Sequence, residues 1–489
     1  MKKRLIYLGV LVLALGAVSS AEARRGTPPL SLIGGAPDFG AVDHLVLPAP
    51  DLDKILANDR ATVGPLRVAE SLTVGRTMKE LASWEKLAGG ALRWRLRVSS
   101  LGAYFLSFQL SDFELPKGGE MHFISVERNY FDGPYSLRNN NPERAFGSPM
   151  VPGDSAVIEV WIPAKAAFVP NFRLDAVSWG YRNFRNILSV PYRDGREVKI
   201  AEKAVSTDKA ACNIDVNCPE GDPWQAQHRS VAEAYDGTFI CSGSVLNSTD
   251  DDCTEYHYLT ANHCFSKGKA SRLTFYWNYE NSACGTNDAP LDQTTTGSTH
   301  LANGNASDFF LVRLNELPPE GYYVSQTGFD ASGATPQSGA TMGFPNDVPM
   351  QLAITDSPLR DGQSDGWGAD HWRVDMWDVG GTDSGSSGGG LWDHNQRVVG
   401  QLHGGIGSCD DGWDEYGKLS VSWGAGAAEH LDPGGTGQLT TDLIDCFGGE
   451  PPPPPPPCEL GQSGDPCTVD EDCCSDNCKK KGKFANTCA

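Results

Sequence analysis

A glycine-rich stretch from Gly385 to Gly390 lies between two closely spaced strand-like runs and constrains how this chain can fold. The runs are HWRVDMW at 371–377 and RVVGQLHGG at 397–405, so the stretch is expected to form a tight turn rather than a free linker. Glycine permits backbone conformations that other residues avoid. Such a turn can present the hydroxyl of Ser387 outward while backbone N–H groups converge on a developing oxyanion. Ser387 is therefore a candidate nucleophile, and a plain glycine–serine loop is the alternative until a base and an acid are found.

The N-terminus has the order of a secretory signal peptide. A basic start, KKR, is followed by an apolar run from Leu5 to Val18 and then by AEA at 21–23. We assign residues 1–23 to a signal peptide with cleavage after Ala23. No later stretch approaches the roughly 20 apolar residues of a membrane span. The sequence thus predicts a secreted, extracellular protein with no membrane span.

Export makes disulfides the expected state of the 14 cysteines, whose even number agrees with full pairing. None of them precedes Cys212, which separates a cysteine-free first part from an oxidised remainder. The formal net charge of −22 argues against nucleic acid as a partner.

Residues 24–205 are interpreted as a propeptide that contains a β-sandwich. From Leu92 onward, apolar residues alternate with three arginines, which is the period of a half-buried strand. Further strand-like runs separated by turn residues predict a small sandwich. No catalytic constellation is seen there, so a folding or inhibitory role is favoured, and carbohydrate or surface binding is the alternative. Lys203 and Lys209 are candidate sites of processing in a charged, exposed segment.

The C-terminal end has a spacer and a small cysteine-rich unit. Residues 448–457 end in seven consecutive prolines, which form a semi-rigid extended linker. Residues 458–489 carry six cysteines in a segment too short to bury a sufficient core. They contain no histidine, which disfavours zinc, and their spacing resembles the cystine-knot (knottin) pattern. That resemblance implies the pairs Cys458–Cys474, Cys467–Cys478 and Cys473–Cys488, and a binding or anchoring accessory is our expectation.

A base and an acid are found between these parts, in residues 206–447. His263 ends the strand-like run YHYLTANHC, and Asp308 immediately precedes the apolar run FFLVRL. Each has a simpler interpretation, as a buried histidine and as a turn acceptor. Together with Ser387 they give the chain order His, Asp, Ser in an all-β domain, which is the chymotrypsin order.

The motifs of this part resemble those of the bacterial lysyl endopeptidases, which are chymotrypsin-like serine proteases. GSSGG is similar to GDSGG and LTANHC to LTAAHC, and further motifs follow in family order over residues 212–446: CNIDVNCPEGD, SGSVLN, YWNYENSAC, SDFFLVRLNEL, VVGQLHGG and DEYGK. The resemblance implies two six-stranded antiparallel β-barrels with His263 as base, Asp308 as its orienting acid and Ser387 as nucleophile. It also implies an oxyanion hole from the N–H groups of Gly385 and Ser387. Gly389-Gly390 departs from the Ser-Pro that is usual in the family.

The same resemblance implies three disulfides in residues 206–447, namely Cys212–Cys409, Cys218–Cys284 and Cys241–Cys264. Cys253 and Cys446 have no counterpart in the family pattern and are paired with each other by elimination.

Substrate preference depends on a different position. In trypsin-like enzymes the specificity aspartate lies six residues before the serine, where this chain has Gly381. The resemblance implies instead that Asp414, in DEYGK, supplies the carboxylate that selects lysine; a solvated loop acid is the alternative. It further implies that His403 stacks with a tryptophan beside the triad acid, and Trp367 is the expected partner.

The sequence thus predicts a monomeric secreted endopeptidase that cleaves protein or peptide substrates after lysine, with no cofactor and no metal. Glutamyl specificity is the enzymatic alternative, because glutamyl endopeptidases also carry a histidine near His403. An inactive protease fold that serves as a binding protein is the alternative from another class.

Overall fold

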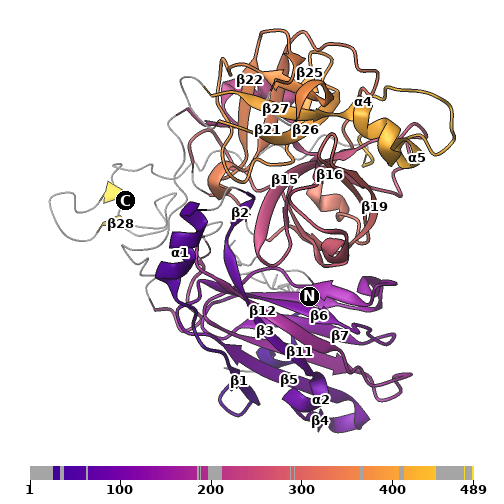
Figure 1. Ribbon diagram of the computed structural model, residues 1–489. Coiled ribbons are helices and arrows are strands. Elements are labelled where there is room, and N and C mark those ends of the chain that lie inside the picture. The colour runs from indigo at the N-terminus through magenta and orange to yellow at the C-terminus, as the bar shows by residue number, and fades with distance from the viewer. Residues whose placement is uncertain are drawn as a thin grey trace, which may run out of the picture.

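The computed structural model describes residues 26–33, 38–61, 64–183, 187, 189–196, 212–286, 288–290, 292–363, 367–406, 412–447, 478–479 and 487–488. The predicted signal peptide, both candidate processing lysines and the polyproline linker lie outside these residues. Figure 1 shows an N-terminal region, residues 26–196, below a C-terminal region, residues 212–447. The cysteine-rich tail is described only at β28 (Cys478–Lys479) and β29 (Thr487–Cys488), which pair antiparallel.

The N-terminal region has two sheets. The first has the order β1-β5-β11-β7-β8 with β4 on β5, and consists of β1 (His44–Val46), β4 (Trp84–Lys86), β5 (Leu92–Ser99), β7 (Glu120–Ser125), β8 (Phe131–Tyr135) and β11 (Ser155–Ile162). The second has the order β10-β6-β12-β3 with β9 on β6, and consists of β3 (Ala69–Thr77), β6 (Phe105–Ser111), β9 (Ala145–Gly147), β10 (Val151–Pro152) and β12 (Arg173–Gly180). The helices are α1 (Leu52–Ala61) and α2 (Met78–Leu81).

The alternating pattern in β5 explains how these sheets pack. Its side chains Trp94, Leu96 and Val98 are buried, whereas the arginines between them are half-buried. The buried face belongs to one core with Phe108 of β6 and Val177 of β12, so both sheets bury their apolar faces against each other. The predicted half-buried strand is confirmed.

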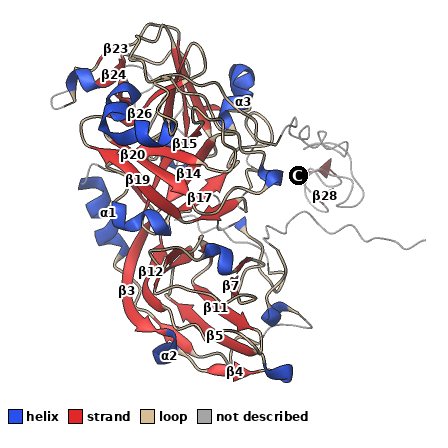
Figure 2. Ribbon diagram, turned by 90° about the vertical axis from the view of Figure 1, so that its right-hand side faces the viewer, coloured by secondary structure: helices blue, strands red, loops and turns tan. Residues whose placement is uncertain are grey.

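The C-terminal region also has two large sheets (Figure 2). The first has the order β18-β17-β14-β15-β16-β20-β19 and consists of β14 (Val231–Tyr235), β15 (Phe239–Leu246), β16 (His257–Ala261), β17 (Thr274–Trp277), β18 (Thr294–Thr296), β19 (Ser298–Gly304) and β20 (Phe309–Leu314). The second has the order β13-β22-β21-β25-β26-β27-β24-β23 and consists of β13 (Ile214–Asp215), β21 (Gly339–Gly343), β22 (Gln351–Thr355), β23 (Arg360–Asp361), β24 (His371–Val374), β25 (Gly390–Asp393), β26 (Val398–Gly405) and β27 (Asp414–Lys418). The short helices are α3 (Gln225–His228), α4 (Leu419–Ser422) and α5 (Ala428–Leu431).

The all-β class is therefore confirmed, although the sheets are larger than six strands. The eighth strand of the first sheet is β2 (Leu66–Arg67), which the N-terminal region contributes by pairing with β15. A core that includes Leu259 and Leu311 of the first sheet and Met342 and Trp392 of the second joins the two sheets. Among the described residues, no helix is long and apolar enough to cross a membrane.

Three disulfides tie the C-terminal region together: Cys218–Cys284, Cys241–Cys264 and Cys253–Cys446. Cys212 is also disulfide-bonded, but its predicted partner Cys409 lies outside the described residues. The side chains of the tail cysteines lie outside them as well. The pairing proposed for the tail therefore stays a prediction.

Candidate active site

The turn that carries Ser387 is held by both sheets of the C-terminal region. The N–H of Ser242 on β15 donates to the carbonyl oxygen of Ser387 at 2.8 Å, and the N–H of Gly388 donates to the carbonyl oxygen of Leu402 on β26 at 2.8 Å. Gly385 and Gly388 have φ angles of 99° and 82°. A Cβ at Gly388 would lie 2.4 Å from the carbonyl oxygen of Ser242, so only glycine fits there. Ser387 is thus carried by a rigid turn.

The Gly-Gly pair after this turn has a steric explanation. A Cβ at Gly390 would lie 2.9 Å from the ring of Trp392, which is fully buried, and a Cβ at Gly389 would lie 2.9 Å from the carbonyl oxygen of Met342. The Trp392 ring thus occupies the space that a side chain at 390 would need.

Two backbone N–H groups at the turn are open donors. Within the described part of the chain, the N–H groups of Gly385 and Ser387 donate to no protein acceptor, whereas the N–H of Ser386 between them donates to the carbonyl oxygen of Asp383 at 3.0 Å. Unpaired N–H groups are rare inside proteins. Beside a serine hydroxyl, two of them can stabilise the negative oxygen of a tetrahedral intermediate.

The pairing of β16 with β20 brings a histidine and an aspartate together. Ala261, at the end of β16, lies opposite Phe309, at the start of β20, so the residues just beyond them become neighbours. The N–H of His263 donates to Oδ1 of Asp308 at 2.9 Å, and Nδ1 of His263 lies 2.6 Å from Oδ2. The same carboxylate therefore fixes both the backbone and the ring of the histidine, which orients Nε2 away from Asp308.

A cavity of about 520 Å³ is lined by His263, Ser387 and Asp414 together. Among the described contacts, the hydroxyl of Ser387 makes no hydrogen bond to His263. Such bonds often tighten only when substrate binds.

Asp414 is a buried pocket residue and not a solvated loop acid. It opens β27 and is 3% exposed. Its Oδ2 accepts hydrogen bonds from Nε1 of Trp377 at 2.6 Å and from the hydroxyl of Thr382 at 2.7 Å. Burial raises the pKa of this carboxyl to about 6. A Cβ at Gly405 would come within 2.2 Å of Oδ1, so the glycine keeps that oxygen uncovered.

His403 stacks on Trp367, with ring centroids 3.9 Å apart. Its Nε2 lies 3.7 Å from Oδ2 of Asp308, and its ring lies over that of His263 at 5.6 Å. Burial lowers the pKa of His403 to about 4, so the ring is neutral at pH 7. The predicted stacking pair is thus adjacent to Asp308.

A fully buried histidine that the sequence did not single out supports this stack. Nε2 of His371, on β24, lies 2.9 Å from Nδ1 of His403, and its Nδ1 lies 3.3 Å from the carbonyl oxygen of Trp367. His371 begins the run HWRVDMW, whose periodicity indicates only a strand. A polar residue in that buried strand was the signal that could have identified it.

The donor sets near the site do not fit a metal. Cys241, His263 and Cys264 lie close together, but the two sulfurs are joined in a disulfide and offer no thiolate. His263, Asp308 and His403 form the other group, and both oxygens of Asp308 already contact His263.

Two family models match the chain: the N-terminal domain of lysyl endopeptidase over residues 46–175, and its C-terminal domain over residues 206–417. Lysyl endopeptidase from Pseudomonas aeruginosa is 24% identical over an alignment of 357 residues, which covers 68% of this chain and 71% of that protein.

Two solved protease structures are similar to part of the chain. The active form of the protease Rv3671c from M. tuberculosis is 17% identical, with a TM-score of 0.31 over 45% of this chain and 90% of that chain. A Glu endopeptidase is 17% identical, with a TM-score of 0.29 over 40% of this chain and 87% of that chain.

The chain is a serine endopeptidase. More particularly, it belongs to the lysyl endopeptidase family, whose two domain models together match most of its length.

The burial of Asp414 predicts a pH-dependent cost in stability. Its pKa rises from 3.8 to about 6 on folding, so ionisation destabilises the folded state, and the cost grows as the pH rises through this range. Two pKa units correspond to about 3 kcal/mol. We expect Asp414→Asn to be more stable than the wild type by up to this amount at pH 8 and nearly equal to it at pH 4. Denaturant unfolding at both pH values measures the difference, and the exposed Asp356→Asn is the control. A difference that does not change with pH would contradict the assignment.

Proposed function

We propose that this endopeptidase cleaves peptide bonds on the carboxyl side of lysine. The observation that carries the proposal is the buried carboxylate of Asp414 in the cavity that also contains Ser387 and His263. An ammonium group taken out of water needs a counter-charge. Trp377 and Thr382 both bind Oδ2, which leaves Oδ1 for the ammonium of a lysine side chain.

The mechanism follows from the geometry around the turn. Ser387 Oγ attacks the carbonyl carbon after the lysine while Nε2 of His263 takes the serine proton. Asp308 holds the ring in the required tautomer and stabilises the imidazolium that forms. The N–H groups of Gly385 and Ser387 bind the oxyanion. His263 then protonates the leaving amine, and water hydrolyses the acyl-enzyme with the same base.

His403 and Trp367 complete the proposed machinery without touching the reacting bond. The neutral His403 ring covers one side of the His263–Asp308 pair, and Trp367 holds that ring by stacking. Their proposed role is to shield the triad carboxylate from water, which strengthens its interaction with His263.

The proposal extends to the organisation of the chain. Residues 1–23 would direct export, 24–205 would be removed as a propeptide, and 206–447 would be the protease domain with a chymotrypsin-like pair of barrels. The linker 448–457 would join it to the accessory tail 458–489. The three disulfides between described residues of the C-terminal region support export, because such bonds persist mainly outside the cytosol.

Glutamyl specificity is the weaker candidate. A negative Asp414 in the pocket would repel a glutamate and attract a lysine. The inactive-fold alternative is disfavoured because the His263–Asp308 pair and both open N–H donors are formed.

Digestion of a denatured protein mixture tests the specificity. We expect the residue before nearly every new cleavage site to be lysine, as identified by mass spectrometry of the peptides. Ser387→Ala is the control and should produce no cleavage above background. Cleavage mainly after glutamate, or after large apolar residues, would refute lysine specificity.

The charge of Asp414 predicts a pH profile. Protonation below about pH 6 removes the counter-charge for lysine, so kcat/KM on a lysyl amide should fall as the pH decreases through this value. Losing one partner of a buried charge pair costs about 2–5 kcal/mol, so Asp414→Asn should reduce kcat/KM at pH 8 at least about 30-fold. Equal activity of Asp414→Asn and wild type at pH 8 would exclude this role.

A further inference from the structure

A strand of the N-terminal region lies in the active-site cleft. Leu66 and Arg67 of β2 pair antiparallel with Ile240 and Phe239 of β15, as Figure 1 shows where the two regions meet. The pairing continues into the next residue, because the N–H of Val68 donates to the carbonyl oxygen of Thr238 at 2.9 Å. This is β-strand addition, the mode by which extended peptides dock on an open sheet edge.

The contact is also apolar and reaches the catalytic turn. Leu66 is 8% exposed and packs in one cluster with Ile240 and Tyr235 of the C-terminal region. Its Cδ2 would be 3.5 Å from a Cβ built on Gly385. The strand therefore covers the turn that carries Ser387.

The residues before β2 enter the cavity itself. Gly64 and Pro65 line it together with His263, Ser387 and Asp414. The turn that carries Ser387 is hydrogen-bonded to β15 of the first sheet of the C-terminal region. Asp414, in contrast, lies on β27 of the second sheet. Because the lysine side chain would point toward Asp414, the residues that follow the scissile bond must run along β15. Gly64–Arg67 thus lies where the leaving-group part of a substrate would bind.

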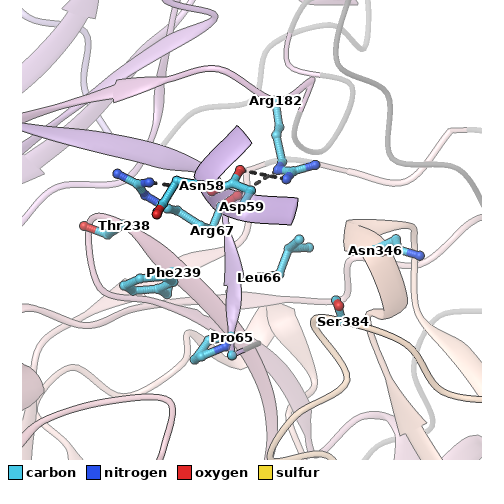
Figure 3. A pocket seen from close by; sticks show the side chains of 11 residues that line it. Asn58, Asp59, Pro65, Leu66, Arg67, Arg182, Thr238, Phe239, Asn346 and Ser384 are labelled. Carbon is cyan, nitrogen blue, oxygen red and sulfur yellow. Dashed lines mark hydrogen bonds and ion pairs between the residues drawn. The ribbon is translucent and has the colours of Figure 1, made fainter. Parts of the chain in front are cut away.

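Side chains of the N-terminal region bind the end of this strand, and Figure 3 shows two of them, Asp59 and Arg182, beside Arg67. The carbonyl oxygen of Arg67 accepts a hydrogen bond from Nε of Arg182 at 2.7 Å, and the hydroxyl oxygen of Tyr181 lies 2.9 Å from it. Asp59 of α1 binds the same two side chains, at 2.7 Å from the Tyr181 hydroxyl and 3.0 Å from Arg182. A strand that is already fixed loses little conformational entropy on docking, so it binds more tightly than a free peptide.

The sequence of the strand makes it a poor substrate for the proposed specificity. Gly64 has no side chain to fill the Asp414 pocket, and Pro65 has no N–H and a fixed φ angle. The segment therefore binds as a peptide but presents no lysine at the reacting position.

We propose that Gly64–Arg67 is a built-in inhibitory strand that occupies the leaving-group side of the cleft and keeps long substrates out. This inference rests on the proposed function in two ways: in assigning the side of the cleft that the leaving group takes, and in explaining why a strand without lysine is a poor substrate. The N-terminal region, residues 26–196, stays docked through β2 after the segment that joins the regions is cleaved. Activity toward proteins appears only when the region is removed.

The test compares two reactions of the full chain, neither of which depends on lysine specificity. One is hydrolysis of fluorescent denatured casein, which must span the whole cleft. The other is labelling of Ser387 by a small fluorophosphonate, which needs only the nucleophile. The protein is used while electrophoresis shows the N-terminal region intact.

Leu66→Asp should raise the ratio of casein hydrolysis to labelling at least 10-fold over wild type. Leu101→Asp makes the same change at a residue of the N-terminal region that is 78% exposed, and it should match the wild type. Asp59→Asn keeps the apolar contact of Leu66 but weakens the binding of Tyr181 and Arg182, which contact β2. It should therefore raise the ratio of casein hydrolysis to labelling by a smaller factor, and this test remains available if Leu66→Asp does not fold.

Two outcomes overturn the proposal in different ways. Unchanged ratios in both variants, with labelling intact, would refute the inhibitory strand and leave the proposed function standing. Absence of labelling in every protein would refute the nucleophile, and the proposed function would fail with it.

Discussion

The carboxylate of Asp308 is the contact on which the site depends. Its Oδ1 accepts a hydrogen bond from the backbone N–H of His263, and its Oδ2 lies 2.6 Å from Nδ1 of the same residue. In addition, the N–H of Asn262 donates to the backbone carbonyl oxygen of Asp308 at 2.7 Å. These three contacts leave the imidazole one orientation. They exist because β16 and β20 pair in register, so the pairing of two strands of one sheet decides where His263 lies. Ser387 comes from the other sheet, and the shared core holds the two together.

Asp414 and β2 act on opposite sides of Ser387. On one side, burial makes the charged form of Asp414 unfavourable, and a lysine ammonium would neutralise that charge. The folded protein would therefore lose stability at Asp414 in favour of substrate recognition. On the other side, Gly64 and Pro65, which lead into β2, line the cavity without offering that ammonium. A single cleft therefore contains both the group proposed to select a substrate and the segment proposed to exclude it.

Local sequence patterns predicted the all-β fold and the main residues of the candidate site. The alternation in β5 and the order of His263, Asp308 and Ser387 depend on spacing along one stretch of chain or on a few motifs. Pairing between distant segments could not be predicted in this way. β2 has two residues, too few to show a period, and its partner β15 lies more than 170 residues later. His371 was missed because a strand pattern does not show which polar group the side chain contacts, here the ring of His403. The need for glycine at 390 was not predictable either, because it depends on how the Trp392 ring packs in the folded protein.

A crystal structure of the C-terminal region, freed of residues 26–196 and inhibited by a peptide aldehyde ending in lysinal, tests the central claim most directly. The account predicts a bond from Ser387 Oγ to the aldehyde carbon, with its oxygen facing the N–H groups of Gly385 and Ser387. It also predicts the lysine ammonium within hydrogen-bond distance of Asp414 Oδ1, about 3 Å. A lysine side chain directed to solvent, or an aldehyde bound to another residue, would contradict the account.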